Sequence, residues 1–496
     1  MSDASSPRSI RAAVLIATVL ASSLGFIDGS VLPVAIPAIR SSLEAGFGQA
    51  QWIVNAYMLL LSSLILVGGT AGDRFGLRET FAGGISVFCL ASIGCALAAS
   101  PSQLIALRAI QGAGAAFMIP GSLALIARAY ESRERGRAIG IWSMASGIAS
   151  AFGPIIAGFL IETGGPEAWR WIFWLNLPIG LIALALLLAH TPRFAAQQDG
   201  GLDLVGALLV TIGLGALALG LTYASDAQPD VLRIALAFLA GVTALALFWF
   251  WEGRSKAPML PRFLFALPVF NGANLLTFFL YFSLAGALFF LPTTLIEALR
   301  LPEAYAGSVF LPFTVTMSIM GAYAGKLTDR IGPRLPLTLG AGVTGLSFLG
   351  LGLAVALQAF WFGIMPAMAV MGIGMGLVVS PLTTTVMTAT DDSLAGTASG
   401  VNNGVARIAG LFAVAGLGVV ASLAYRLSID PALVPGGYGE PMVPMDPAAQ
   451  AMRAYALITA FLSVALSTAL LSFLSAYIGW RMLPAVIPEG QQRKGR

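Results

Sequence analysis

The sequence predicts an all-α membrane protein with fourteen transmembrane helices, and two observations support this fold class. Of its 496 residues, 57% are hydrophobic and only 10% are charged, and the mean hydropathy is +0.86. These values lie outside the range of soluble globular domains. The apolar residues also form long runs without two-residue alternation, which favours helices over barrel strands, because lipid offers backbone groups no hydrogen-bond partner.

Each expected helix is an apolar run of about 20 residues, the length that crosses a hydrocarbon layer. The expected spans are 12–32, 52–71, 79–99, 103–127, 138–161, 171–189, 204–223, 231–251, 269–291, 304–327, 335–357, 360–388, 394–422 and 454–478. The first run could instead be a signal peptide, since Arg8 and Arg11 precede it. We take it as a span, because it is longer than a typical signal core and no clear cleavage site ends it.

Basic residues support this count, because Lys and Arg gather in cytoplasmic loops. With the N-terminus inside, 19 of the 27 Lys and Arg residues fall on the cytoplasmic side and 5 outside. Both termini of this multi-pass chain are therefore expected in the cytoplasm, with the chain in the plasma or inner membrane. The net charge of +4 then reflects topology and not nucleic-acid binding.

Two loops indicate an internal repeat. "GTAGDRFGLR" at 69–78 and "GKLTDRIGPR" at 325–334 agree at five of ten positions, and each follows the second helix of its half. We expect two homologous six-helix halves, with two additional spans inserted between them. The predicted domains are 1–190, a linker with the helix pair at 191–262, and 263–496.

Asp28 is a lone carboxylate inside the first apolar run. The nearest charges along the chain are Arg11 and Arg40, so Asp28 is expected at membrane depth, where an ionisable residue is a candidate functional group by default. A carboxylate that only satisfies a helix kink, next to Gly29 and before Pro33, is the alternative.

The fourth helix carries a matching cation. Arg108 and Gln111 share one face with Gly112 and Ala115, because their spacing is i, i+3, i+4 and i+7. At 1.5 Å per residue, Asp28 lies roughly 25 Å from the membrane face at the start of its helix, and Arg108 lies roughly 30 Å from the same face. We therefore expect Asp28 and Arg108 to interact directly or through water. An arginine that snorkels to the interface is the alternative.

These motifs resemble a known family. The "GTAGDRFGLR" loop and "RAIQGAGAA" at 108–116 resemble signatures of the major facilitator superfamily. "WRWIFWLNLPIG" at 169–180 and "GFIDGSVLPVAIP" at 25–37 are similar to its fourteen-helix drug:proton antiporter branch. The resemblance implies the major facilitator fold, alternating access by two rocking halves, and a role for Arg108 in proton transfer.

The resemblance also implies a latch between the halves. Asp73 would contact the start of a helix near Ser393, where unpaired N–H groups favour negative charge. Asp329 would pair beside the basic stretch 133–137, and Leu77 departs from the usual pattern. The expected latch residues are Asp73, Arg74, Arg78, Asp329, Arg330 and Arg334. A solvated charged turn is the alternative.

The fifth helix resembles the antiporter motif of this branch. Its matching positions are Gly140, Gly153, Pro154 and Gly158, while alanine stands at two positions that usually hold glycine. Small residues every four positions allow close helix approach, and Pro154 bends the helix. Ordinary small-residue packing is the alternative.

Three further polar residues are candidates for substrate or proton contact: Asn55, Tyr57 and Arg407. Other polar groups in spans, such as Asn274 and Asn402, are as suited to bonding a neighbouring helix.

The sequence carries no catalytic or metal-ligand constellation and no glycine-rich phosphate-binding loop. We expect no enzyme activity, no metal and no cofactor, with transport driven by the proton gradient. The expected function is export of hydrophobic or amphipathic molecules, such as drugs or toxins, in exchange for protons. Alternatives are a dedicated exporter of one metabolite (a siderophore, an antibiotic or a fatty-acid-like product) and a receptor-like relative without transport. The expected partners are these substrates, protons and lipid, with no nucleic acid, for a monomer that could work with periplasmic or outer-membrane proteins.

Overall fold

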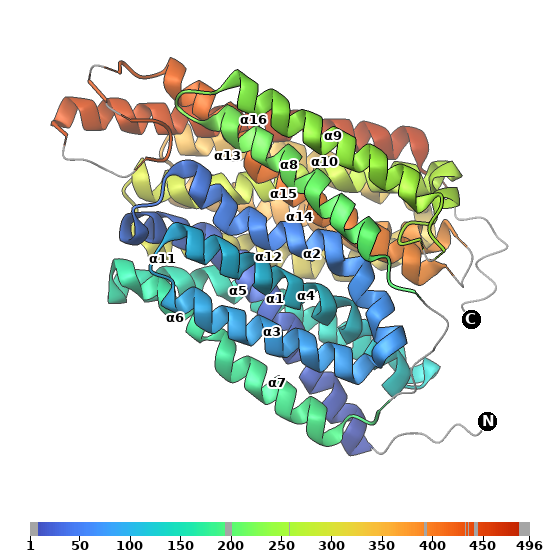
Figure 1. Ribbon diagram of the computed structural model, residues 1–496. Coiled ribbons are helices and arrows are strands. Elements are labelled where there is room, and N and C mark those ends of the chain that lie inside the picture. The colour runs from blue at the N-terminus through green and yellow to red at the C-terminus, as the bar shows by residue number, and fades with distance from the viewer. Residues whose placement is uncertain are drawn as a thin grey trace. The chain divides into compact units, whose positions relative to one another are not determined.

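The computed structural model describes residues 8–193, 201–256, 258–390, 394–431, 433–434, 436–440 and 445–485. Within these ranges, fourteen helical segments are long and apolar enough to cross a membrane, which confirms the predicted number (Figure 1). The described secondary structure is helical, with turns and bends between the helices and no strand in those ranges. The all-α membrane fold class is therefore confirmed.

The helices fall into two compact units, described here one at a time. The first takes in the described residues of 1–217 and 237–259, and the second those of 218–236 and 260–496. The inserted helices α8 (Leu204–Ser225) and α9 (Val231–Glu252) are thus divided between the units. The predicted domain boundaries at 190 and 262 remain a prediction.

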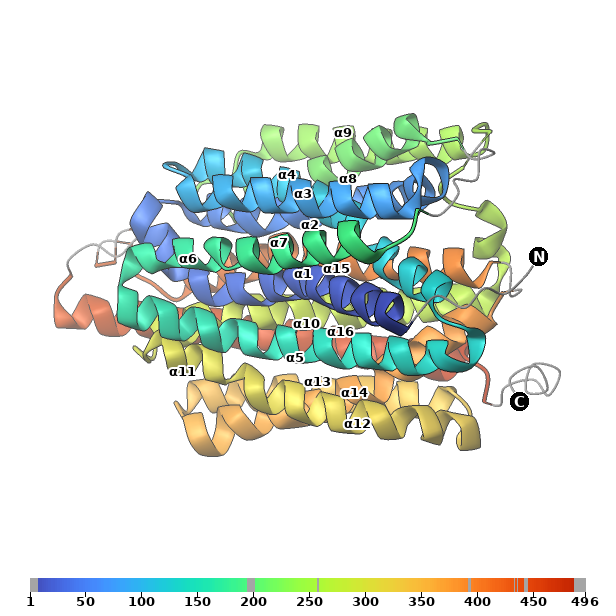
Figure 2. The same ribbon diagram turned by 90° about the horizontal axis from the view of Figure 1, so that it is seen from below.

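The first six spans form a bundle of helices that run side by side (Figure 2). Its elements are α1 (Arg8–Leu43), α2 (Phe47–Phe75), α3 (Leu77–Leu97), α4 (Pro101–Ala129), α5 (Ser132–Gly164), a 3₁₀ turn η1 (Pro166–Ala168), α6 (Trp169–Trp174) and α7 (Asn176–His190). The run predicted as one helix over 171–189 is broken at Leu175, between α6 and α7. The first predicted helix is longer than expected, since α1 continues past two prolines to Leu43.

The second unit contains the last six spans. Its elements are η2 (Arg262–Ala266), α10 (Pro268–Glu297), α11 (Glu303–Ser308), α12 (Phe310–Ile331), α13 (Arg334–Ala356), a π-helical turn η3 (Phe360–Ile364), α14 (Met365–Thr388), α15 (Ala395–Leu427) and α16 (Pro447–Met482). The run predicted over 304–327 is broken between α11 and α12, and the run over 360–388 begins with the π turn.

The same helix pairings occur in both units, as expected for a repeat. In the first, α1 packs on α5 and α7, and α4 packs on α2 and α3. In the second, α10 packs on α15 and α16, and α14 packs on α12 and α13. The repeated loops also turn alike, because Gly76 and Gly332 have φ values of +99° and +78°. Such positive φ values favour glycine, which explains why both loops keep it there.

Equivalent glycines bring the helices of each unit close together. A Cβ on Gly112 of α4 would lie 2.3 Å from the Tyr57 carbonyl oxygen of α2. A Cβ on Gly372 of α14 would lie 2.1 Å from the Phe313 carbonyl oxygen of α12. Any larger residue at either position would push the paired helices apart. In the first unit, this contact sets the distance between the two helices that carry Tyr57 and Arg108.

Candidate functional site

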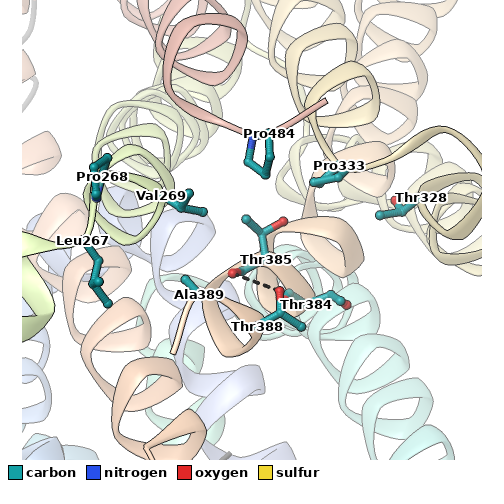
Figure 3. A pocket seen from close by; sticks show the side chains of 10 residues that line it. All are labelled: Leu267, Pro268, Val269, Thr328, Pro333, Thr384, Thr385, Thr388, Ala389 and Pro484. Carbon is teal, nitrogen blue, oxygen red and sulfur yellow. Dashed lines mark hydrogen bonds between the residues drawn. The ribbon is translucent and has the colours of Figure 1, made fainter. Parts of the chain in front are cut away.

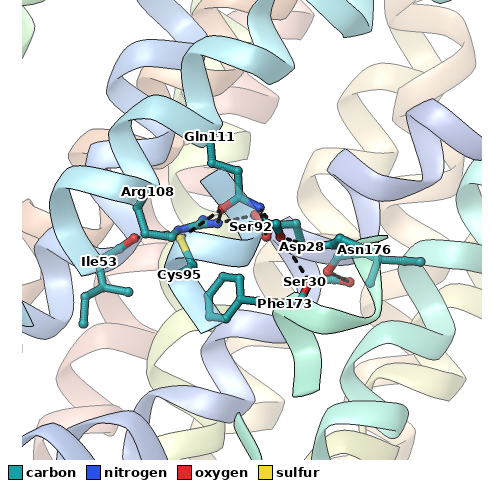
Figure 4. Close-up of polar contacts among 10 residues, drawn as sticks. Asp28, Ser30, Ile53, Ser92, Cys95, Arg108, Gln111, Phe173 and Asn176 are labelled. Carbon is teal, nitrogen blue, oxygen red and sulfur yellow. Dashed lines mark hydrogen bonds and ion pairs between the residues drawn. The ribbon is translucent and has the colours of Figure 1, made fainter. Parts of the chain in front are cut away.

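Asp28 and Arg108 form a buried ion pair in the first unit. Asp28 of α1 is 0% exposed and Arg108 of α4 is 1% exposed. Arg108 Nη1 donates to Asp28 Oδ2 at 2.5 Å, as Figure 4 shows. The structure thus brings together the two charges that the sequence placed at similar depth. Their role in proton transfer remains a prediction.

Gln111 completes the pair into a polar cluster. Its Oε1 accepts a hydrogen bond from Arg108 Nη1 at 2.6 Å, and its Nε2 donates to Asp28 Oδ1 at 3.1 Å. One turn of α4 therefore presents both a guanidinium and an amide to the same carboxylate, as the i, i+3 spacing predicts. Both carboxylate oxygens of Asp28 accept hydrogen bonds from N–H groups, one from Arg108 and one from Gln111.

The cluster continues into α3 and α7 through residues that the sequence analysis did not single out. Gln111 Nε2 also donates to Ser92 Oγ at 3.2 Å, and Asn176 Nδ2 donates to the same oxygen at 2.9 Å. Ser92 in turn donates to the Phe173 carbonyl oxygen at 3.2 Å. All of these side chains are buried, and Figure 4 shows how they lie together. The only signal for Asn176 was its place, as a polar residue, in the stretch "WRWIFWLNLPIG".

Arg108 is further held by α2. Its Nε donates to the Ile53 carbonyl oxygen at 3.1 Å, and its guanidinium lies 4.4 Å from the centre of the Tyr57 ring. A cation over an aromatic face is stabilised by the ring quadrupole, most strongly when both are desolvated. Tyr57, a predicted site residue, is therefore part of the cluster. Asn55 of α2 is also buried, and neither atom of its amide has a hydrogen-bond partner within the described part of the chain.

The motif on α5 lies partly beside this cluster. A Cβ on Gly153 would lie 2.6 Å from Ser30 Oγ and 3.4 Å from the Ile27 carbonyl oxygen. Gly153 thus lets α5 pack closely against the turn of α1 that carries Asp28. Pro154 and Gly158 are buried in the same stretch, whereas Gly140 is exposed, with open space around the position of a Cβ.

Arg407 lies on α15 of the second unit and is half-buried. It interacts electrostatically with Tyr281 of α10. Nearby on the same helix, Asn402 Nδ2 donates to Asn274 Oδ1 at 3.1 Å and to Thr277 Oγ1 at 2.7 Å. These amides bond neighbouring helices of one unit, which is the simpler of the two roles expected for them.

The second unit has no counterpart of the charged pair at the equivalent place. Arg108 and Gln111 lie four residues and one residue before Gly112 on α4. The residues four and one before the equivalent Gly372 on α14 are Met368 and Met371, and both are buried. The cation and amide of the cluster therefore belong to one half of the repeat.

The predicted latch residues make contacts inside their own units. Asp73 is 60% exposed and lies 3.5 Å from Arg128. Arg78 Nη2 donates to the Leu188 carbonyl oxygen at 2.5 Å, and Arg334 Nε donates to the Leu483 carbonyl oxygen at 2.8 Å. These two arginines occupy equivalent loop positions, and each binds a backbone carbonyl at the end of the sixth span of its repeat, α7 in one and α16 in the other.

The other latch residues predicted from the sequence are Arg74, Asp329 and Arg330. Arg74 lies over the Phe75 ring at 5.5 Å, and Arg330 is exposed. The side chain of Asp329 and residue Ser393 lie outside the described residues. The latch between the halves remains a prediction.

A second buried ion pair joins α10 to α16 in the second unit. Glu297 and Arg453 are 3.0 Å apart, and each side chain is 8% exposed. Arg453 also donates to the Glu440 carbonyl oxygen at 3.0 Å, which fixes Glu440 against α16. The sequence placed Glu297 near the outer end of its span but did not indicate its partner.

A cavity of about 240 Å³ lies among the helix ends of the second unit (Figure 3). Prolines and threonines line much of it, among them Pro268, Pro333 and Thr385. The Thr385 hydroxyl donates to the Pro381 carbonyl oxygen of its own helix at 2.7 Å. None of the described residues that line it carries a charge, so their chemistry differs from that of the Asp28 cluster.

A bundle of spanning helices built from a six-helix repeat, with a buried carboxylate–guanidinium pair in its first half, is typical of a membrane transporter. Residues 18–414 match the model of the Major Facilitator Superfamily. The chain belongs to the Major Facilitator Superfamily, which confirms the resemblance noted in its motifs.

Several relatives have names that refer to drugs or antibiotics. The chain is 32% identical over 424 residues to the multidrug resistance protein Stp of Mycobacterium tuberculosis, covering 84% of this chain and 77% of the relative. It is 32% identical over 398 residues to the methylenomycin A resistance protein of Streptomyces coelicolor, covering 79% and 82%. It is 33% identical over 435 residues to the cephamycin export protein CmcT of Amycolatopsis lactamdurans, covering 86% and 88%.

Solved transporter structures share the fold. A bacterial homologue of the human lysosomal transporter Spinster matches with a TM-score of 0.67 at 16% identity, covering 96% of this chain and 98% of that one. A D-xylose-proton symporter matches with a TM-score of 0.64 at 14% identity, covering 95% and 98%. At these identities the likeness establishes the fold alone.

Proposed function

We propose that this membrane protein exports hydrophobic or amphipathic small molecules in exchange for protons. The names of its relatives, which refer to multidrug resistance, methylenomycin A resistance and cephamycin export, support the substrate class. The fold supports alternating access, in which two homologous halves expose a central site to each side of the membrane in turn.

The observation that carries the proton coupling is the buried pair of Asp28 and Arg108. Burial disfavours the charged carboxylate, whereas the guanidinium and the Gln111 amide favour it. These opposing effects allow Asp28 to gain or lose a proton when a nearby charge or the surrounding water changes. A single carboxylate with this environment can couple proton binding to substrate binding nearby.

Exchange follows if substrate and proton compete for Asp28. A cationic substrate near the carboxylate favours release of its proton, and binding of a proton from outside favours release of the substrate. Such mutual exclusion is an unfavourable (positive) coupling free energy between two ligands, and each ligand must weaken binding of the other by the same factor. A bulky neutral substrate would give the same result if it displaced the groups that bind Asp28.

The test is transport in proteoliposomes with an imposed pH gradient, using a panel of cationic, neutral and anionic hydrophobic compounds. We expect gradient-driven accumulation of at least one compound, and substrate-driven proton movement that Asp28→Asn abolishes. Asp230→Asn is a matched control, because Asp230 is an exposed carboxylate that caps α9 and Asn caps helices equally well. Substrate transport with unchanged proton coupling in Asp28→Asn would refute the proposal.

Export of one dedicated metabolite is a second candidate. It is favoured by relatives named for single antibiotics, such as methylenomycin A and cephamycin. The same panel separates the two functions: a dedicated exporter moves one chemical type, whereas a multidrug exporter moves several unrelated ones.

A further inference from the structure

Each hydrogen bond around Asp28 has a defined donor and acceptor, and this arrangement suits only the ionised carboxylate. Gln111 uses both of its N–H groups as donors, one to Asp28 and one to Ser92, while its oxygen accepts from Arg108. Asp28 receives only donors in this arrangement. A protonated Asp28 would need an acceptor instead, and the cluster as it stands presents none to it.

We propose that the Gln111 amide is a switch that follows the protonation of Asp28, and that Ser92 is the positioning residue that biases this switch toward the ionised state. The proposal rests on the proposed function for its role in transport. The switch is a half-turn of the amide, which exchanges its oxygen and its NH₂ group at almost no change in shape. In the turned state the amide oxygen faces Asp28 and accepts a hydrogen bond from its protonated carboxyl group.

Ser92 sets the bias because its own bonds are fully used. Its oxygen accepts from both Gln111 and Asn176, and its hydroxyl proton is donated to the Phe173 carbonyl oxygen. If the amide turned, Ser92 would have to donate to Gln111 and give up Phe173. The turned state therefore gives up the hydrogen bond from Ser92 to Phe173. It also loses the hydrogen bonds that Gln111 Oε1 accepts from Arg108 and Cys95.

The charged and titratable groups around the cluster are consistent with this switch. Arg108 of α4 can only donate hydrogen bonds. Cys95 of α3 lies with its Sγ 3.9 Å from Gln111 Oε1, and Tyr57 of α2 faces the guanidinium. The turned amide would no longer accept from Arg108, which would keep the Ile53 carbonyl oxygen and the Tyr57 ring. Protonation of Asp28 would thus leave Arg108 bound mainly to groups of α2.

The test titrates the full-length protein in lipid and follows the infrared band of the protonated carboxyl group that Asp28→Asn removes. We expect Ser92→Ala to move the midpoint upward by about 0.4–1 pH unit, a roughly 2- to 10-fold change, because the bias of one neutral hydrogen bond is lost. Ser475→Ala is the matched control. It removes an equally buried serine that donates to the Leu276 carbonyl oxygen, outside the cluster, and its midpoint should equal that of the unmodified protein.

A second measurement follows the Gln111 amide itself, through isotope-labelled glutamine assigned with Gln111→Leu. Its signal should change with the same midpoint as the carboxyl band. An unmoved midpoint in Ser92→Ala, an equal shift in Ser475→Ala, or an amide signal that ignores the titration would each overturn the switch. None of these results depends on transport, so a failure of proton-coupled transport would refute the proposed function and leave the switch standing.

Discussion

We predict that Asp28→Asn and Arg108→Gln both destabilise the protein, and that only Arg108→Gln regains stability as the pH falls. Each substitution leaves the other charge buried without its partner. The isolated carboxylate can bind a proton and become neutral, whereas a guanidinium stays charged at any pH at which the protein folds. The two variants therefore differ in whether their stability recovers as the pH falls, and not only in how much stability they lose.

The magnitude follows from the contacts that remain. Removing one partner of a buried pair costs about 3–5 kcal/mol. In Asp28→Asn, Arg108 keeps Gln111 Oε1 at 2.6 Å, the Ile53 carbonyl oxygen at 3.1 Å and the Tyr57 ring at 4.4 Å, so the cost should lie near 3 kcal/mol. In Arg108→Gln, Asp28 keeps the Gln111 N–H at 3.1 Å, so the cost at neutral pH should approach 5 kcal/mol.

The pH dependence has a definite sign. In Arg108→Gln, the folded protein binds a proton at Asp28 more readily than the unfolded chain, so its stability rises as the pH falls. At mildly acidic pH the remaining cost should be about 1–3 kcal/mol, that of an imperfectly bonded neutral group. The double variant leaves no buried charge and should be more stable at neutral pH than Arg108→Gln alone.

Denaturant unfolding in detergent micelles, at mildly acidic and mildly alkaline pH, measures all three variants. The reasoning fails if the costs of the two single substitutions add in the double variant, because that result would mean that the residues do not interact. It also fails if Asp28→Asn recovers at acidic pH to the same extent as Arg108→Gln.

Three further predictions concern packing, a second ion pair and an alkaline titration. Gly112→Ala should lower stability by about 1–3 kcal/mol, because its Cβ meets a backbone carbonyl of α2, whereas Gly140→Ala meets open space and should change nothing; thermal unfolding of both variants checks this. Glu297→Gln leaves Arg453 without its carboxylate and should speed limited proteolysis between α15 and α16; an unchanged cleavage rate would show that the pair does not hold this segment. Burial raises the pKa of Tyr130, with Glu134 adding to the rise and Arg11 opposing it. The protonated Tyr130 hydroxyl therefore contributes to folding stability in full below about pH 10, and this contribution is lost as the pH rises further. Above about pH 10, the free energy of unfolding should therefore fall less steeply with pH in Tyr130→Phe than in the unmodified protein. Identical slopes would contradict this prediction.

The spans could be predicted because a bilayer imposes one length on every helix that crosses it. Their ends were less accurate. Helix α1 continues to Leu43, because Pro33 and Pro37 bend a helix in protein surroundings without ending it. The break at Leu175 was missed, because nothing in an apolar run separates one long helix from two short ones.

The charged core of the site could be predicted because charges are rare at membrane depth, and counting residues along two helices is enough to compare their depths. Ser92 and Asn176 could not be found in this way. Small polar residues are common in membrane helices, and their bonds depend on which helix lies opposite. The same holds for Arg78 and Arg334, whose partners are backbone carbonyls at helix ends, which leave no mark in the sequence.

The most direct test of the central claim is substrate-driven proton movement in proteoliposomes, measured for the unmodified protein, Asp28→Asn and Asp230→Asn. We predict proton release on substrate addition in the unmodified protein and in Asp230→Asn, and none in Asp28→Asn. Equal proton movement in all three would contradict the claim that Asp28 couples transport to the proton gradient.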